Sequence, residues 1–153
     1  MKITEILDPE NIEPDLKGQS KPEVLHELAA CLAAKHREVE IDNLAIVLAE
    51  RERLGSTAIG DGIAIPHGKI ASVDRIHGAF GRHRQGVDFE SLDGGPTHLF
   101  FVLVAPEDST SLHLKALARV SRLFKDAAFR ENLMKATDTS EIYRIISEED
   151  SRY

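Results

Sequence analysis

The 153-residue sequence has a single cysteine, no long apolar run and no excess of positive charge. With Cys31 alone, the chain can form neither an intramolecular disulfide nor a zinc cluster built from thiolates. The longest apolar run, residues 99–105, is far shorter than the roughly 20 residues that a membrane-spanning helix needs. The net charge is −7 and the basic residues are scattered, so no basic stripe indicates a surface for nucleic acid or an anionic membrane.

The rest of the composition, 42% hydrophobic and 29% charged residues, is that of a soluble globular protein. We expect one domain over residues 1–153, with residues 1–19 and 149–153 peripheral to it. The N-terminus lacks the apolar core of a signal peptide, so we expect a cytoplasmic protein without membrane insertion. Cys31 lies among alanines and leucines at helical spacing, which favours a buried structural thiol over a reactive one.

A first helix is predicted from residue 20 to about residue 35. Ser20 and Glu23 can form a capping box at its start, and the apolar residues that follow make one stripe. His26 and His36 fall on the polar side of this pattern. We therefore expect both histidines to be solvated surface residues.

Asp42 predicts the start of a second helix, with Ile41 and Ile46 placed as a hydrophobic staple and Gly55 at the end. Arg51 lies near the C-terminus of this helix and continues its apolar stripe instead of opposing it. Two interpretations of Arg51 remain open at this point. Its guanidinium either faces a functional site or complements the helix dipole.

The middle of the chain predicts short strands separated by glycines, and then one long strand. Residues 63–65, 76–83 and 86–89 are strand candidates, and residues 97–104 are apolar almost without interruption. Such a run is typical of a strand that is covered on both faces. Three histidines in or beside these strands suggest no shared function: His77, His83 and His98.

The last third of the chain predicts three helices, which with the strands indicates a layered α/β domain. Polar residues at 108–111 can cap the first of them, and shorter helices are predicted near residues 127–136 and 140–148. His113 lies in the first turn of the first helix and shares its inward face with three apolar residues: Leu117, Val120 and Phe124. A core histidine with a satisfied hydrogen bond is the ordinary interpretation of such a position.

A glycine-rich stretch, residues 55–68, presents His67 between Pro66 and Gly68. Three chemistries compete for this histidine. A metal site with His113 lacks an HExxH or a paired Cys/His spacing to complete it, and hydrolysis lacks a GxSxG elbow. The third is phosphorylation of His67, which needs no separate base because a neutral imidazole is already nucleophilic.

Phosphorylation also has candidate partners for the phosphoryl oxygens. Glycines at 60–62 can expose backbone amides, the helix that begins near His113 offers its N-terminus, and Arg51 can bind phosphate in a bidentate way. The stretch is not a Walker A motif, since the following lysine and Ser/Thr are missing, so nucleotide binding is not expected.

These residues resemble the active-site signature of phosphotransferase-system (PTS) enzyme IIA domains of the fructose/mannitol class, known as type 2. The match is Arg51-Glu52-x-x-Gly55-Ser56-Thr57-x-Ile59-Gly60-x-Gly62-Ile63-Ala64-Ile65-Pro66-His67-Gly68. The chain is most like the nitrogen-regulatory branch, because of its first helix and because no sugar-binding domain is fused within the 153 residues. The resemblance implies one α/β domain with a mixed, mostly parallel sheet flanked by helices.

The resemblance also implies a site and partners. His67 would accept phosphate on Nε2 from a histidine phosphocarrier protein, and His113 would help to bind it. Arg51 would belong to the same pocket, with Thr57 near it and no metal or cofactor. Asp61 stands where asparagine is common in the family, which would place a negative charge near the site and slightly weaken anion binding.

Two functions follow from this resemblance. One is a regulatory phosphocarrier whose phosphorylation state controls cytoplasmic targets, which in the family include potassium-transport proteins and sensor kinases. The other is a metabolic enzyme IIA that passes phosphate to a sugar-specific IIB component.

Overall fold

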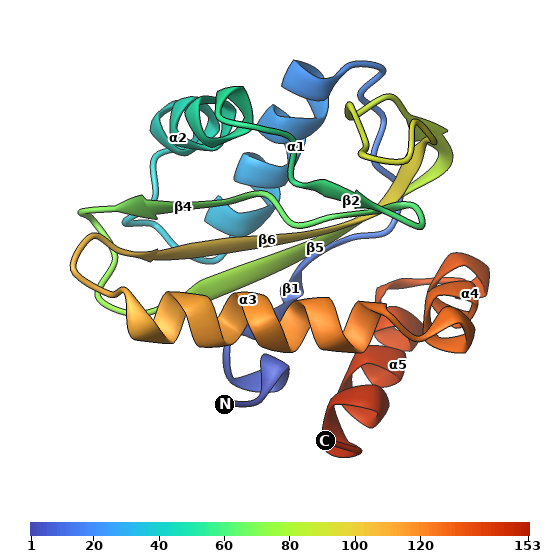
Figure 1. Cartoon of the computed structure of the whole chain (residues 1–153). Coiled ribbons are helices and arrows are strands. Elements are labelled where there is room, and N and C mark those ends of the chain that lie inside the picture. The colour runs from blue at the N-terminus through green and yellow to red at the C-terminus, as the bar shows by residue number, and fades with distance from the viewer.

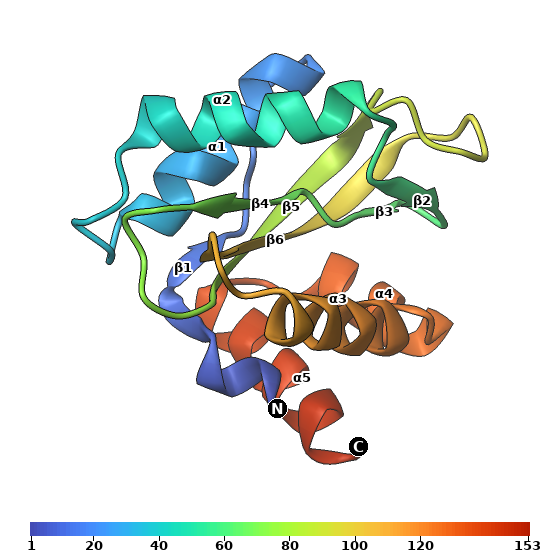
Figure 2. The same ribbon diagram turned by 60° about the vertical axis from the view of Figure 1, so that its left-hand side comes forward.

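Strand β6 (Thr97–Pro106) lies in the middle of the sheet and pairs with three other strands in the computed structural model, which describes residues 1–153. Its neighbours are β5 on one side (Figure 1) and β3 followed by β4 on the other (Figure 2). The remaining strands are β1 (Leu7–Glu13), β2 (Ala58–Gly60), β3 (Ile63–Ala64), β4 (His67–Ile70) and β5 (His77–Val87). Three of the five strand pairings are parallel and two are antiparallel, so the expected mixed α/β sheet is confirmed.

Helices cover both faces of this sheet. On one face lie α1 (Lys21–Ala33) and α2 (Ile41–Arg53), and on the other lie three helices: α3 (Ser111–Phe124), α4 (Ala127–Lys135) and α5 (Thr139–Ser151) (Figure 2). A short 3₁₀ helix, Ile3–Glu5, precedes β1. No helix combines the length and the apolar character that crossing a membrane requires.

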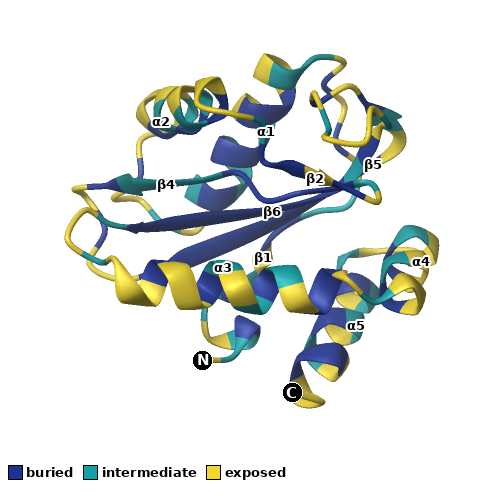
Figure 3. Ribbon diagram, viewed as in Figure 1, coloured by how far each residue is buried: buried dark blue, intermediate teal, exposed yellow.

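Two hydrophobic cores, one on each face, explain why residues 99–104 are all apolar. Side chains of successive strand residues point to opposite faces. Leu99, Phe101 and Leu103 enter the core beneath α3, whereas Phe100 and Val102 enter the core beneath α1 and α2. Strand β6 is therefore buried on both faces along its apolar length, as expected from the sequence (Figure 3).

The first helix begins as predicted, but the second does not. Ser20 Oγ accepts a hydrogen bond from the Glu23 amide, which confirms Ser20 as the cap of α1. The predicted capping box is not completed, because the Glu23 carboxylate accepts from the Gln19 amide at 2.7 Å. The cap of α2 is Glu40, whose carboxylate accepts from the Asn43 amide at 2.6 Å. The predicted cap at Asp42 is therefore wrong, because this residue already lies inside the first turn. The predicted staple is wrong as well, since Ile46 is 58% exposed.

Parts of the two terminal segments, residues 1–19 and 149–153, are buried, although both segments were expected to be peripheral, and residues 151–153 are exposed. The acidic, proline-containing segment after Leu7 forms β1, the edge strand beside β5, and Leu7 and Ile12 enter a core. An edge position tolerates Pro9 because one side of the strand has no partner to which an amide must donate. Near the C-terminus, Asp150 is buried and pairs with Arg119 on α3.

Candidate functional site

His67 is the first residue of β4, a strand that the sequence did not predict, and it follows the predicted strand at residues 63–65. It lies beside Leu103 of β6, and Figure 2 shows β4 between α2 above and α3 below. Pro66 precedes it and is buried. Through these neighbours the histidine is placed where helices from both faces of the sheet can reach it.

The backbone fixes which ring nitrogen of His67 carries the proton. Nδ1 lies 2.8 Å from the carbonyl oxygen of Ile65. A carbonyl oxygen can only accept, so Nδ1 must be the donor, and the lone pair of the neutral ring is on Nε2. Burial lowers the pKa of His67 below its usual value, and the positive charge of Arg51 lowers it further against the opposing effect of the Ile65 carbonyl. His67 is thus a neutral imidazole with its basic nitrogen at Nε2.

Arg51 reaches this nitrogen from the last turn of α2. Its Nε donates to His67 Nε2 at 3.2 Å, and its Nη1 donates to the Gly55 carbonyl oxygen at 2.8 Å. The helix can approach β4 because residue 68 is glycine: a Cβ there would lie 2.6 Å from Val47 Cγ1. Of the two interpretations of Arg51, the one in which it faces the histidine agrees with this geometry.

His113 approaches His67 from the opposite face of the sheet. It is the third residue of α3, it is 7% exposed, and its ring centroid lies 5.3 Å from that of His67. Burial lowers the pKa of His113 to about 4, with contributions from nearby His67 and Lys69. Its Nδ1 is buried without a hydrogen-bond partner. His113 is therefore neutral and has an unsatisfied polar atom next to His67, which differs from an ordinary core histidine.

Thr57 does not point its hydroxyl at His67. The hydroxyl donates to Glu52 Oε2, and the Thr57 amide donates to Glu52 Oε1 at 3.1 Å. Lys21 of α1 completes this buried group with an ion pair of 2.8 Å to Glu52. In this arrangement Thr57 fixes the turn that follows α2, and its expected contact with a phosphoryl group remains a prediction.

The glycines at 60–62 are not brought to His67, contrary to expectation. They form the turn between β2 and β3, where Gly60, Asp61 and Gly62 all have positive φ. Ile63 lies beside Leu99 of β6, whereas His67 lies beside Leu103, so the turn is displaced by four residues or roughly 13 Å along the strand. Asp61 is exposed in this turn, and its charge is correspondingly remote from His67.

Lys69 is a neighbour of the site that the sequence analysis missed. It is two residues after His67 on β4, and residues two apart share one face of a strand. Its positive charge contributes to the lowered pKa of His113. The position of Lys69 two residues after His67, which puts both on the same face of a strand, was the signal that could have identified it. Glu52 stands in the matched signature but was given no role, because a charged helix residue gives no sign that it is buried.

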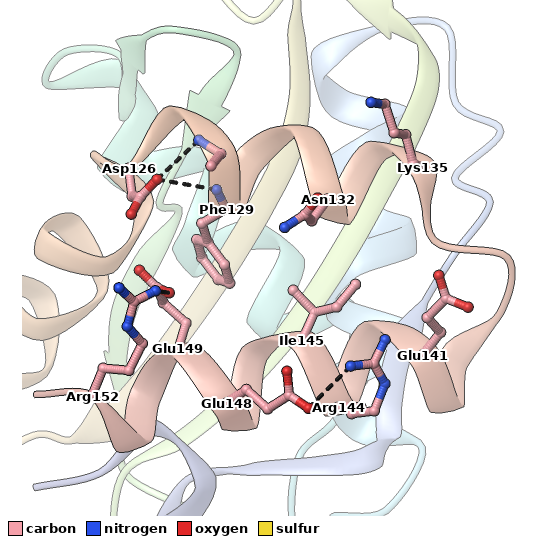
Figure 4. A pocket seen from close by; sticks show the side chains of 11 residues that line it. Asp126, Phe129, Asn132, Lys135, Glu141, Arg144, Ile145, Glu148, Glu149 and Arg152 are labelled. Atoms are coloured by element: carbon pink, nitrogen blue, oxygen red, sulfur yellow. Dashed lines mark hydrogen bonds and ion pairs between the residues drawn. The ribbon is translucent and has the colours of Figure 1, made fainter.

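Other clusters of polar residues lie away from these residues. A hollow of about 400 Å³ between α4 and α5 has charged walls, but Arg144 pairs with Glu148 and Arg152 with Glu149 (Figure 4). The group of three side chains that converge closely enough to hold a metal ion excludes both His67 and His113. The meeting point of β4, α2 and α3 is therefore the candidate site.

Comparisons with known proteins agree with this fold. Residues 5–149 match the family model described as phosphoenolpyruvate-dependent sugar phosphotransferase system, EIIA 2. A nitrogen regulatory protein of Bradyrhizobium diazoefficiens is 44% identical over 147 residues, which are 96% of this chain and 95% of that protein. The fructose-specific EIIABC component of Bacillus subtilis is 41% identical over 98% of this chain, which spans 24% of that protein.

A solved structure supports the same assignment. The nitrogen regulatory protein IIA-Ntr from Neisseria meningitidis superposes with a TM-score of 0.86 at 36% identity, covering 94% of this chain and 98% of that one. Matches of sequence and of structure thus extend over nearly the whole chain. The chain belongs to the EIIA 2 family of the phosphoenolpyruvate-dependent sugar phosphotransferase system.

Proposed function

We propose that this protein is a regulatory phosphocarrier of a nitrogen-related phosphotransferase system, in which His67 accepts a phosphoryl group from a histidine phosphocarrier protein. The observation that carries this proposal is the contact of His67 Nε2 with Arg51. It combines a nucleophilic lone pair, left free by the Ile65 carbonyl, with a guanidinium at the place where phosphoryl oxygens would arrive.

The reaction exchanges one nitrogen–phosphorus bond for another. The Nε2 lone pair of His67 attacks the phosphorus of the donor phosphohistidine, the N–P bond of the donor breaks, and the donor nitrogen leaves with the electron pair. Nδ1 keeps its proton and its hydrogen bond to Ile65 throughout. Such a transfer needs in-line positioning and stabilisation of the equatorial oxygens more than it needs acid–base chemistry.

Three side chains support this part of the proposal, because they lie close enough to His67 to bind phosphoryl oxygens. Arg51 contacts the attacking nitrogen directly, and His113 has a buried Nδ1 without a partner beside the His67 ring. Lys69 adds positive charge from the same strand face. When the phosphoryl group arrives, its oxygens can accept hydrogen bonds from Arg51, His113 and Lys69. Such donors fit a group that is present only in the phosphorylated state.

Exposed apolar side chains on the two flanking helices support docking of a protein donor. Leu112 and Leu114 on α3 are 50% and 60% exposed, on either side of His113 in the sequence. Leu54, directly after α2, is 85% exposed. Apolar side chains around a histidine favour contact with another protein surface over contact with a small solute.

The regulatory role rests on the nitrogen regulatory relatives, which match the chain over nearly its full length. A phosphoryl group adds roughly two negative charges, which is enough to create or abolish an interface with a target such as a potassium-transport protein or a sensor kinase. The second candidate is a metabolic enzyme IIA that passes the phosphoryl group to a IIB component. It is favoured by the 41% identity to the fructose-specific protein.

The central test is phosphorylation by phosphoenolpyruvate with the general phosphotransferase proteins, followed by measurement of phosphohistidine. We expect the parent to be labelled on His67 Nε2 and His67→Ala to remain unlabelled. His26→Ala is the matched control because His26 is exposed and far from β4 in the sequence. Equal labelling of His67→Ala and the parent would refute the phosphocarrier.

A second test separates the two functions. The phosphorylated protein is mixed with a fructose-type IIB domain, and loss of its phosphoryl group is followed over time. A regulatory phosphocarrier is expected to keep its label for much longer than a fructose-specific IIA domain treated in parallel. Transfer as fast as that of the metabolic domain would favour the sugar-uptake function.

A further inference from the structure

A second cluster of histidines lies outside the site of His67. The loop between α1 and α2 supplies His36 and Glu38, and the start of β5 supplies His77. The ligand atoms of these three residues all lie within 4.8 Å of one another. The two imidazole rings are 3.8 Å apart at an angle of 34°, and Glu38 Oε1 lies 3.7 Å from His36 Nδ1. From the sequence, we expected His36 to be a solvated surface residue and His77 to share no function with His83 and His98. The side chain of His36 is only 16% exposed, and the fold brings it to His77.

We propose that His36, Glu38 and His77 form a binding site for one divalent transition-metal ion, with Zn²⁺ as the best fit. Two imidazoles and one carboxylate are a donor set that Zn²⁺ uses when a water molecule completes the tetrahedron. Hard ions such as Mg²⁺ and Ca²⁺ prefer oxygen ligands and fit this set poorly. The site would be independent of phosphorylation at His67.

The distances allow a tetrahedral ion after small rotations of the side chains. With Zn–N distances of about 2.0–2.1 Å, two ligand atoms of a tetrahedral site are roughly 3.3 Å apart. The cluster needs to contract by roughly 1–1.5 Å between its farthest ligand atoms, given the 4.8 Å limit of the present separations. Glu38, with 47% of its side chain exposed, is free to make this movement, whereas His77 on β5 is buried and fixed.

The environment leaves room for the ion and its water. A hollow of about 180 Å³ reaches the two histidines and is also lined by Asp8, Lys35 and Arg75. Lys35 is held by Asp8 at 2.9 Å, so its positive charge is balanced next to the cluster. Arg75 is exposed and its charge is screened by solvent. One water molecule takes up roughly 30 Å³, which this hollow accommodates.

The pair of His36 and His77 differs from His83, the other buried histidine of β5. His83 Nε2 lies 2.8 Å from the Gly18 carbonyl oxygen, and His83 Nδ1 accepts from the Gly86 amide at 3.0 Å. Both nitrogens of His83 are thus used in holding loops together. The imidazoles of His36 and His77 instead face each other and a carboxylate, which is an arrangement that a shared cation would stabilise.

The metal would join the loop before α2 to the centre of the sheet. His77 pairs with Val104, which also pairs with Gly68, so the cluster lies two strands from the residue after His67. This separation is roughly 10 Å between backbones. An ion here would stabilise the fold without touching the phosphoryl acceptor.

The test uses the full untagged chain, freed of metal by dialysis against chelator and then titrated with Zn²⁺ in a calorimeter. We expect one bound Zn²⁺ per chain and no response to Mg²⁺. At a Zn²⁺ concentration a hundredfold above Kd, Tm should rise by roughly 5–10 °C. Co²⁺, used as a spectroscopic probe, should show the intense visible bands of a four- or five-coordinate ion.

Substitutions of the three proposed ligands test where the Zn²⁺ ion binds. His36→Ala and Glu38→Gln change residues outside helices and strands, so they are expected to fold normally, and each should weaken Zn²⁺ binding at least tenfold. His77→Ala should do the same, while His26→Ala and His67→Ala should bind as the parent does. Absence of Zn²⁺ binding, or binding that survives His36→Ala combined with His77→Ala, would overturn the proposal. Loss of binding in His67→Ala alone would move the ion to the phosphoryl site and overturn it too.

The Zn²⁺ site and the phosphocarrier function of His67 can be refuted independently of each other. Chelator should remove Zn²⁺ from the chain and leave its labelling by an already phosphorylated donor unchanged. If labelling is lost with the metal, the independence of the two sites is wrong, whereas failure of His67 to label leaves the Zn²⁺ titration unaffected.

Discussion

Arg51 Nε donates a hydrogen bond of 3.2 Å to His67 Nε2, the ring nitrogen that we propose as phosphoryl acceptor. The lone pair in this bond is the one that must attack phosphorus. Arg51 therefore has to release the nitrogen as the phosphoryl group arrives and bind its oxygens instead. The five donors of a planar guanidinium suit this exchange, because Nη1 can stay on the Gly55 carbonyl while others turn to the phosphoryl group.

Replacement of Arg51 tests this exchange. Arg51→Ala should slow phosphoryl acceptance by His67 roughly 10²-fold, since a donor aimed at transition-state charge is lost. Arg51→Lys should recover only a small part of the rate, because a lysine keeps the charge but not the fork. Quenched-flow transfer from a phosphorylated donor provides the rates. Arg53→Ala, an exposed change on the same helix, is the matched control. Rates for Arg51→Ala within twofold of this control would remove Arg51 from the site.

His113→Ala should slow transfer to and from His67 while the protein remains folded. The variant loses the imidazole whose buried Nδ1 has no partner in the free protein. We expect a loss of roughly 10²-fold in both directions, since one group beside the transferred phosphoryl oxygens is lost, measured with the same phosphorylated donor. Far-UV circular dichroism checks the fold. Normal kinetics in both directions would show that His113 is a packing residue only.

The lowered pKa of His113 also predicts how stability depends on pH. Burial and nearby positive charge lower this pKa to about 4, whereas an unfolded histidine titrates near ~6.5. Between these values the unfolded chain binds a proton that the native protein does not, so this histidine makes the free energy of unfolding fall as pH decreases. His113→Ala lacks the effect, and its stability relative to the parent should improve as pH is lowered from 7 to 4. Urea unfolding at several pH values measures it, and a difference that stays constant with pH would contradict the buried, neutral state.

Much of the fold was predictable because its signals are local. The run at 97–104 needed only the rule that a strand covered on both faces is apolar throughout, and the cap at Ser20 needed only its spacing to Glu23. Strand β1 was missed because its polar side chains and Pro9 are tolerated only at the edge of a sheet. Which segment lies at an edge is a property of the assembled sheet and not of the segment.

In the candidate site, too, local signals were predictable from the sequence, whereas contacts set by the assembled fold were not. His67 could be singled out from residue type and position, whereas Arg51 and His113 became candidate site residues through the family resemblance. The glycines at 60–62 were misplaced because a phosphate cradle and a tight turn between two strands use the same residues. Only the register of β3 and β4 on β6 distinguishes the two. The protonated nitrogen of His67 depends on a carbonyl two residues away, and its direction is set by the fold.

Gly68 keeps α2 close to β4. A Cβ at residue 68 would lie 2.6 Å from Val47 Cγ1, so Gly68→Ala should push the helix outward and shift Arg51 away from His67. We expect a loss of about 1–3 kcal/mol in the free energy of unfolding, together with slower phosphoryl acceptance. Val47→Ala removes the clashing methyl group, and combining it with Gly68→Ala should restore much of the rate. If the double variant is as slow as Gly68→Ala, the close approach of helix and strand is not what positions Arg51.

Asp150 links both ends of the chain to α3. Its Oδ1 accepts from Arg119 Nε at 3.0 Å and Nη2 at 2.7 Å, and its Oδ2 accepts from the Thr4 amide at 3.2 Å. Burial tends to raise the pKa of Asp150, but the hydrogen bond from Arg119 and those from the backbone outweigh it, so the pKa is lowered. The stabilisation is therefore present above the pKa of an unfolded aspartate and is lost as pH falls through the lower folded value.

Removal of this carboxylate leaves the largely buried Arg119 without its ion-pair partner, and only the backbone carbonyl oxygen of residue 150 still accepts from its Nη2. Asp150→Ala should reduce the free energy of unfolding at pH 7 by about 3–5 kcal/mol. Glu148→Ala is the matched control, because its pair with Arg144 is exposed on the same helix and should contribute no more than about 0.5 kcal/mol. Urea unfolding at pH 7 and near pH 3 gives the comparison, and the deficit of Asp150→Ala should shrink at the lower pH. A loss below 1 kcal/mol at pH 7, or one that does not change with pH, would mean that apolar packing and not this ion pair holds the two ends of the chain on α3.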